Sequence, residues 1–242
     1  MCKYFHISKA HCNGHVIPTL CIVTPDYRNR TAEQIASEDI FHDAIGFGYR
    51  AASWLDYAKR TENFAAAQYA AIDGRLSIEH LVFELLVITS GPELTEENYK
   101  RCLNEPRKLQ KLLNQIVPDY DKLVHFSALI ASMEPGIPEI NTWDIRELMR
   151  SWGVLSENLH WSGAHVQTTE NSKWQADTLE KIAGVVEPYW ERMSLGRSGC
   201  MRVESMDSKV QEIWEDFKSG TIEVSSAKTR LELIRPLLKN YA

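Results

Sequence analysis

Apolar residues recur at the three- and four-residue spacing of an α-helix along most of the chain after residue 30. The stretch from Phe64 to Ile88 is apolar on nearly every side, which predicts a central helix that neighbours cover on several sides. Gly46, Gly48 and the alanines around them predict a narrow helix before it, which a neighbour can approach closely. Further helical stretches are expected over residues 95–117 in short pieces, 123–133, 143–152, 169–193, 209–218 and 227–241, with a turn or helix over 155–160.

Threonines and glycines predict where several of these helices begin and end. Thr31 and Gln34 have the spacing of a capping box, in which each side chain bonds the other residue's backbone. Thr61 and Thr142 are expected to cap the helices that follow them, and Gly153 is expected to end one.

The first residues have a different pattern, because strand-forming residues fill 4–12 and 15–23. Asn13-Gly14 between them suits a type I′ turn, and Pro18 favours an edge strand. The expected fold is therefore mainly α, a multi-helix bundle with a short N-terminal β-hairpin. We divide it into the hairpin (1–30), the helical bundle (31–194), and a linker with a C-terminal helical pair (195–242) that packs on the bundle or on a partner.

Charge and cysteine content exclude some classes of protein. With 27 basic and 33 acidic residues, the net charge of −6 opposes non-specific binding to nucleic acid or anionic membranes. No apolar stretch is long enough to span a bilayer, and five irregularly spaced cysteines do not suggest a disulfide framework. We expect a cytoplasmic protein with no membrane association.

The hairpin is dense in residues that zinc selects, and its register tests whether they can converge. Cys12 would face His15, and His6 would face Cys21. These pairs lie six residues apart along the strands, or roughly 20 Å, which is too far for one tetrahedral site. We therefore expect no bound metal, and without nucleotide-binding or hydrolase motifs we expect no cofactor.

Two short motifs carry a resemblance to a known family. Arg75 and His80, with four residues between them, resemble the RxxxxH signature of the HEPN superfamily, and Leu155-Ser156-Glu157-Asn158-Leu159-His160 is similar to a stretch in HEPN-like bundles. The resemblance implies a metal-independent ribonuclease of a toxin or phage-defence system, acting on RNA and forming a homodimer. His160 and His80 would move protons, Arg75 would bind phosphate, and the polar neighbours would be Ser156, Glu157 and Glu79.

Helix geometry leaves a second interpretation open. Arg75 and His80 point about 140° apart on one straight helix, whereas Arg75 and Glu79 share a face as an ordinary ion pair. His160 is equally consistent with a structural histidine that bonds a backbone carbonyl. The alternative is a non-catalytic helical interaction or adaptor protein. Its protein partner would dock on the C-terminal helices, through Trp214, Phe217, Leu231, Ile234 and Leu237.

Overall fold

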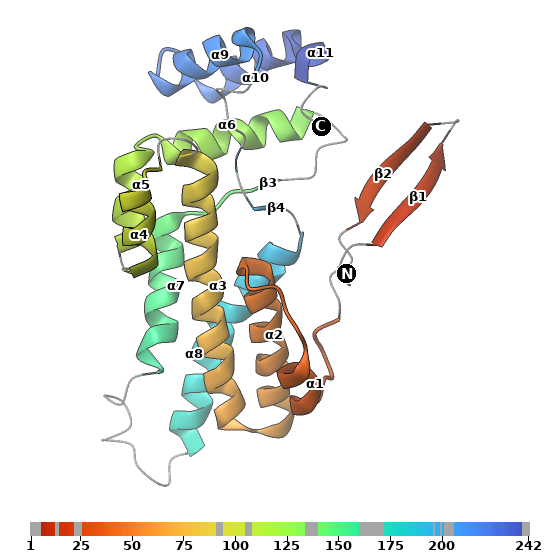
Figure 1. Cartoon of the computed structure of the whole chain (residues 1–242), viewed down its shortest axis with the longest axis vertical. Helices are drawn as coiled ribbons and strands as arrows, with labels where there is room; N and C mark the ends of the chain where they lie inside the picture. Colours follow the sequence, from red (N-terminus) through yellow and green to blue (C-terminus); the bar gives the residue numbers. More distant parts are fainter. Residues whose placement is uncertain are drawn as a thin grey trace.

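The structure is a computed structural model, and the residues it describes are mainly helical, as the sequence predicts (Figure 1). The described residues are 6–12, 15–21, 26–90, 94–104, 108–133, 140–159, 172–195, 197–198, 200 and 206–238; for 6–21, 102–104, 172–173 and 197–198 only the backbone is described. The helices are α1 (Ala32–Ser37), α2 (Ala44–Thr61), α3 (Phe64–Ser90), α4 (Glu96–Asn104), α5 (Leu109–Ile116), α6 (Tyr120–Met133), α7 (Ile145–Glu157), α8 (Ser172–Leu195), α9 (Ser208–Lys218), α10 (Val224–Leu233) and α11 (Arg235–Leu238).

The long helix α3 is the centre of the main core, and α2, α7 and α8 pack along it (Figure 1). Close approach of α2 depends on Gly48, as the small residues of this helix predict. A Cβ atom at Gly48 would lie 3.0 Å from the Ser77 hydroxyl and 3.3 Å from the Trp190 ring. On α3 itself, a Cβ at Gly74 would lie 3.1 Å from Leu155 of α7 and 3.2 Å from Val186 of α8. Small residues therefore set the spacing between these helices.

A second core lies on α6, where the C-terminal helices α9, α10 and α11 pack (Figure 1). Phe126 of α6 is fully buried, with the rings of Trp214 and Phe217 at 5.3 and 5.8 Å. Leu231 of α10 is also fully buried in this cluster. The apolar faces expected to dock a partner thus contact α6 of the same chain.

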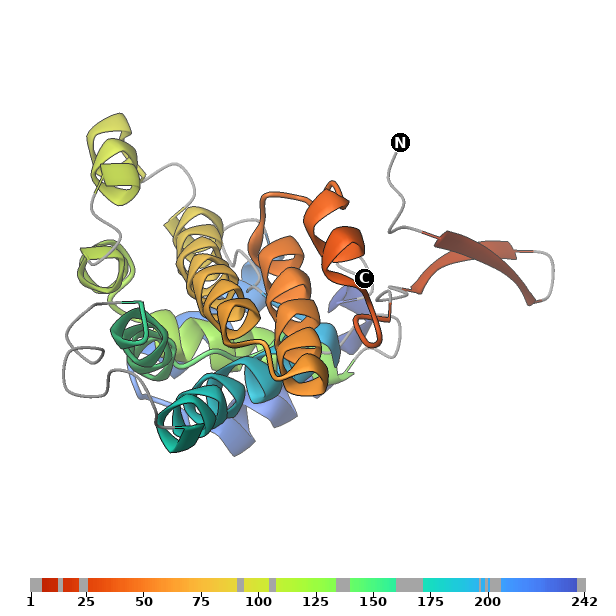
Figure 2. The same ribbon diagram turned by 90° about the horizontal axis from the view of Figure 1, so that it is seen from below.

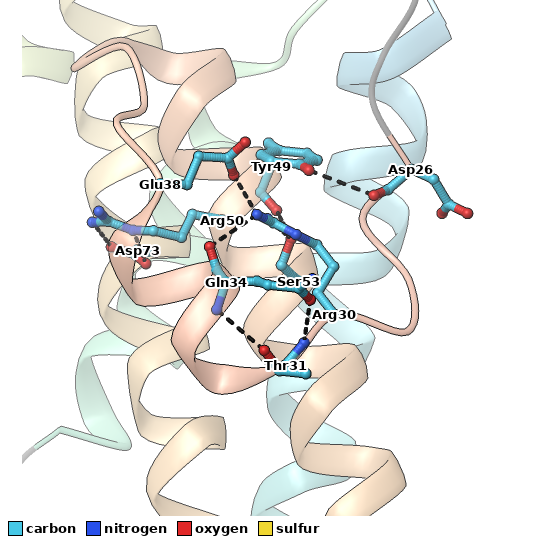
Figure 3. A network of polar contacts seen from close by, with 9 residues as sticks. All are labelled: Asp26, Arg30, Thr31, Gln34, Glu38, Tyr49, Arg50, Ser53 and Asp73. Carbon is cyan, nitrogen blue, oxygen red and sulfur yellow. Dashed lines mark hydrogen bonds and ion pairs between the residues drawn. The ribbon is translucent and has the colours of Figure 1, made fainter.

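The segment before α2 is fastened to the bundle by polar contacts (Figure 3). Thr31 and Gln34 form the predicted capping box at the start of α1. Arg30 donates hydrogen bonds to Ser53 at 3.1 Å and to Glu38 at 2.6 Å. The Arg30 guanidinium thus forms an ion pair with Glu38 and a hydrogen bond with Ser53 of α2. These contacts hold residues 30–38 against α2.

Two strand pairs accompany the helices. β1 (His6–Cys12) and β2 (His15–Cys21) pair antiparallel, with Cys12 opposite His15 and His6 opposite Cys21. Their side chains lie outside the described residues, so the expectation about metal binding stays a prediction, as does the division of the chain into three units. β3 (Ile140–Asn141) and β4 (Arg197–Ser198) form a two-residue parallel pair. Among the described helices, none combines the length and apolar character needed to cross a membrane.

Several predicted helix ends are wrong. Thr61 is the last residue of α2, and its hydroxyl bonds back to a carbonyl of that helix, while Asn63 accepts the hydrogen bond from the start of α3. Asp144 rather than Thr142 caps α7, because a carboxylate accepts from two backbone N–H groups there. Gly153 lies inside α7, which continues to Glu157, since packing on α3 outweighs the intrinsic cost of one glycine.

The region after Thr31 forms two helices, α1 and α2. α1 ends at Ser37, and Asp43 begins α2 by accepting a hydrogen bond from the Gly46 backbone N–H. A second carboxylate, that of Glu84 on α3, accepts from the Ala44 N–H at 2.9 Å. Both acids satisfy N–H groups that a continuous helix would have bonded internally, so the break is stable.

Candidate functional site

Arg75 forms the predicted ion pair with Glu79, one turn further along α3. The Arg75 Nε lies 3.0 Å from Glu79 Oε1, and the two side chains are 33% and 15% exposed. Trp152 of α7 completes the cluster, because its indole N–H donates to the same carboxylate oxygen at 2.7 Å. The Arg75 guanidinium also lies over the Trp152 ring, 5.1 Å from its centroid. These contacts join α3 to α7.

His80 lies toward α2 instead of toward α7. The His80 ring is 5.0 Å from the ring of Phe47 on α2. The ring of His42, just before α2, lies 5.8 Å from the same phenylalanine. Arg75 and His80 therefore contact different neighbouring helices, as five helical steps of about 100° require. The structure does not bring this Arg–His pair to a common site.

The other predicted site residues lie at the end of α7. Ser156 is one turn beyond Trp152 on the same helix face, is 6% exposed, and its hydroxyl has no hydrogen-bond partner among the described residues. Glu157 is exposed. His160 lies outside the described residues. A catalytic group built from His160, Ser156 and Glu157 with Arg75 and Glu79 therefore stays a prediction.

α2, α7 and α8 cover α3 on several sides, as the sequence predicts, but one further side of the helix is exposed. Tyr69 is 52% exposed, and Ile72 and Val87 are each 39% exposed. Leu76 and Phe83 are half-buried between them. At about 100° per residue these five side chains occupy one face, and they are here called the α3 stripe. In Figure 2, α3 lies between α4 and α2, and α1 lies beyond α2.

Aromatic residues of neighbouring helices border the α3 stripe. The Trp54 ring of α2 lies 5.3 Å from that of Tyr69, and the half-exposed Tyr99 of α4 lies 5.6 Å from Phe83. The stripe and its border thus form an apolar surface that runs over three helices. Isolated exposed apolar residues need no explanation, but several on one helix face, here interrupted by the half-buried His80, are typical of interaction surfaces.

A buried ion pair lies beside this surface, between α2 and α3 (Figure 3). Arg50 bonds both oxygens of the Asp73 carboxylate at 2.7 Å, and the Asp73 side chain is only 5% exposed. Another carboxyl of α3, at the start of α2, is that of Glu84, whose pKa burial raises above its usual value. Burial also raises the pKa of the Tyr189 hydroxyl, which hydrogen-bonds Ser77 at 2.8 Å. These groups are bonded within the chain and serve to position α3.

A polar cleft of about 420 Å³ lies where the start of α7 meets α5, α6 and α8. Arg192 lies over the Trp143 ring at 4.6 Å and donates a hydrogen bond to the Thr142 carbonyl. Lining side chains of both charges face the cleft: Arg146 and Arg192, against Asp121, Asp144 and Glu147. Mixed charge makes the cleft a poor match for a polyanion. Sequence reasoning missed it, because residues from four segments form it and only the helix start near Thr142 was recognisable.

Comparison with protein families, with curated proteins and with solved structures finds no match for this chain. The resemblance to HEPN proteins therefore stays a prediction.

Proposed function

We propose that this protein is a non-catalytic helical interaction protein that binds another protein through the α3 stripe. The observation that carries the proposal is the exposed apolar row itself, Tyr69, Ile72 and Val87 with the half-buried Leu76 and Phe83. The hydrophobic effect favours covering such a row, at roughly 25 cal/mol for each Å² removed from water. The aromatic side chains that border it are of the type enriched in protein interfaces.

The contacts of Arg75 favour this proposal over a nuclease. The RxxxxH chemistry needs both side chains at one phosphate, whereas the Arg75 Nε–H donates to Glu79 and the guanidinium lies over Trp152 of α7. His80 contacts Phe47 on α2, away from that cluster. Both members of the RxxxxH pair thus have structural partners, which accounts for them without chemistry.

The α3 stripe also replaces the C-terminal helices as the proposed docking surface. Trp214 and Leu231 are buried in the second core on α6. Docking through them would require separating α9 and α10 from α6 and exposing Phe126, so the C-terminal pair is a poor surface for a partner.

The test uses a photoreactive amino acid placed in the full-length chain. Position 72 lies in the α3 stripe. Position 233 on α10 is the control, because Leu233 is 79% exposed and lies outside the α3 stripe. In extracts of the source cells we expect defined protein adducts at position 72 and none of the same proteins at position 233. Adding Leu76→Glu should abolish the adducts at position 72. Adducts that persist with Leu76→Glu, or that form equally at both positions, would contradict the proposal.

The ribonuclease prediction is tested separately by incubating the purified protein with labelled RNA, with and without a chelator. The interaction proposal expects no cleavage above that of a mock purification. Chelator-resistant cleavage that is lost in His160→Ala, at an unchanged melting temperature, would establish the enzyme and overturn the non-catalytic assignment. A lowered melting temperature without any RNA cleavage would identify His160 as a structural residue.

A further inference from the structure

The positions of the α3 stripe are spaced nearly symmetrically about Ile78. Tyr69 and Val87 are each nine residues from Ile78, Ile72 and Phe83 are six and five residues from it, and Leu76 has the half-buried His80 as its counterpart. An antiparallel pair of helices related by a two-fold axis places equidistant positions opposite each other. We propose that the α3 stripe binds a second copy of this chain, with the two α3 helices antiparallel. This inference rests on the proposed function and names the partner.

Two charged side chains beside the stripe, Arg75 and Glu79, would face the opposite charges of a second copy of the chain. Arg75 and Glu79 lie on the α7 side of the stripe, on either side of Ile78. The two-fold axis keeps this side and reverses the direction, so Arg75 of one copy lies within about 3 Å, along the helix, of the level of Glu79 in the second copy. Such flanking charges set orientation in paired helices, and a parallel pair would lack this match. The intrachain pair becomes a cluster of four alternating charges.

The size of the stripe predicts a weak association. It spans nineteen residues, or about 27 Å, and a helix is about 10 Å wide, so each copy contributes roughly 300 Å². The bordering Trp54 and Tyr99 add to this surface. The total stays below the roughly 800 Å² per partner of a standard stable interface. We therefore expect a reversible dimer with a dissociation constant in the micromolar range.

The first test measures the mass of the purified full-length protein by sedimentation equilibrium from micromolar to hundreds of micromolar concentration. Wild type should shift from monomer to dimer. Ile72→Glu should stay monomeric, because it places a carboxylate in the contact close to Phe83 of the second copy, and Leu233→Glu should dimerise like wild type. A wild-type monomer throughout this range would overturn the proposal, and so would dimerisation of Ile72→Glu with unchanged affinity.

The second test isolates the charge pairing between copies. Arg75→Glu and Glu79→Arg should each weaken self-association at least tenfold, because like charges then face each other across the axis. An equimolar mixture should form a heterodimer, since each altered charge meets an opposite one, although the intrachain pair is broken in both chains. Self-association of either variant at wild-type strength, or a mixture that stays monomeric, would overturn the antiparallel arrangement. Circular dichroism checks that both variants fold; if either does not, Ile72→Glu decides.

The two proposals fail in different ways. A monomeric chain whose position 72 still forms adducts with a different protein would refute self-association and keep the interaction function. A chain that dimerises through the stripe but captures no other protein would identify the second copy as the partner.

Discussion

Replacing Arg50 with methionine would leave the Asp73 carboxylate between α2 and α3 without its partner. The carboxylate is only 5% exposed, and Arg50 provides both of its ion-pair hydrogen bonds. Removing one partner of a buried ion pair costs roughly 3–5 kcal/mol of stability, because the other charge stays desolvated and unpaired. Since Arg50 itself is 27% exposed, water reaches the vacated position, and we expect about 3 kcal/mol. Methionine keeps most of the packing of the side-chain stem.

This loss should lower the melting temperature by roughly 6–12 °C, at about 2–4 °C per kcal/mol for a chain of this size. Thermal and urea unfolding followed by circular dichroism measure both quantities. Lys100→Met is the matched control, because its pair with Glu96 is 66% and 81% exposed and should contribute less than about 1 kcal/mol. The double variant Arg50→Met/Asp73→Leu should recover most of the lost stability, because no buried charge remains. A cost for Arg50→Met as small as that of Lys100→Met would refute this account, and additive losses in the double variant would do the same.

Three further predictions follow from individual contacts. Burial raises the folded-state pKa of Glu84, so ionisation of this carboxyl opposes folding above that pKa. Glu84→Gln, whose side-chain oxygen can still accept from the Ala44 N–H, should therefore be as stable as wild type or more stable at pH 7. In thermal melts at decreasing pH, the difference in stability should vanish as pH falls through the raised pKa to the ordinary one. Gly46→Ala should lower the stability of the fold by more than about 1 kcal/mol, because the new Cβ would overlap the Phe41 backbone carbonyl. Gly184→Ala should raise it by about 0.5–1 kcal/mol, because no atom lies within 4 Å of a Cβ there. Equal changes of the two variants in urea titrations would contradict this geometry. Phe126→Ala should cost about 3–5 kcal/mol and expose α9 and α10 to proteolysis, and unchanged protection would show that the second core does not depend on this ring.

Local physics made part of the candidate site predictable. The pairing of Arg75 with Glu79 follows from four-residue spacing on any helix, and the divergence of Arg75 from His80 follows from the helical turn angle. The capping box of Thr31 and Gln34 is equally local. The partners from other helices were not predictable, because Trp152 is more than seventy residues from Glu79 along the chain.

The sequence by itself determined that the protein is mainly helical and that α3 is central, because both follow from periodicity and composition. It did not determine which side of α3 is covered, since a helix that is apolar all round carries no marker of orientation. The tertiary structure decided this through contacts between distant residues, such as Gly48 against Ser77 and Arg50 with Asp73. With α2, α7 and α8 so placed, the face from Tyr69 to Val87 is the one left open. Helix formation is a local equilibrium, whereas the choice of buried face depends on the packing of the whole chain.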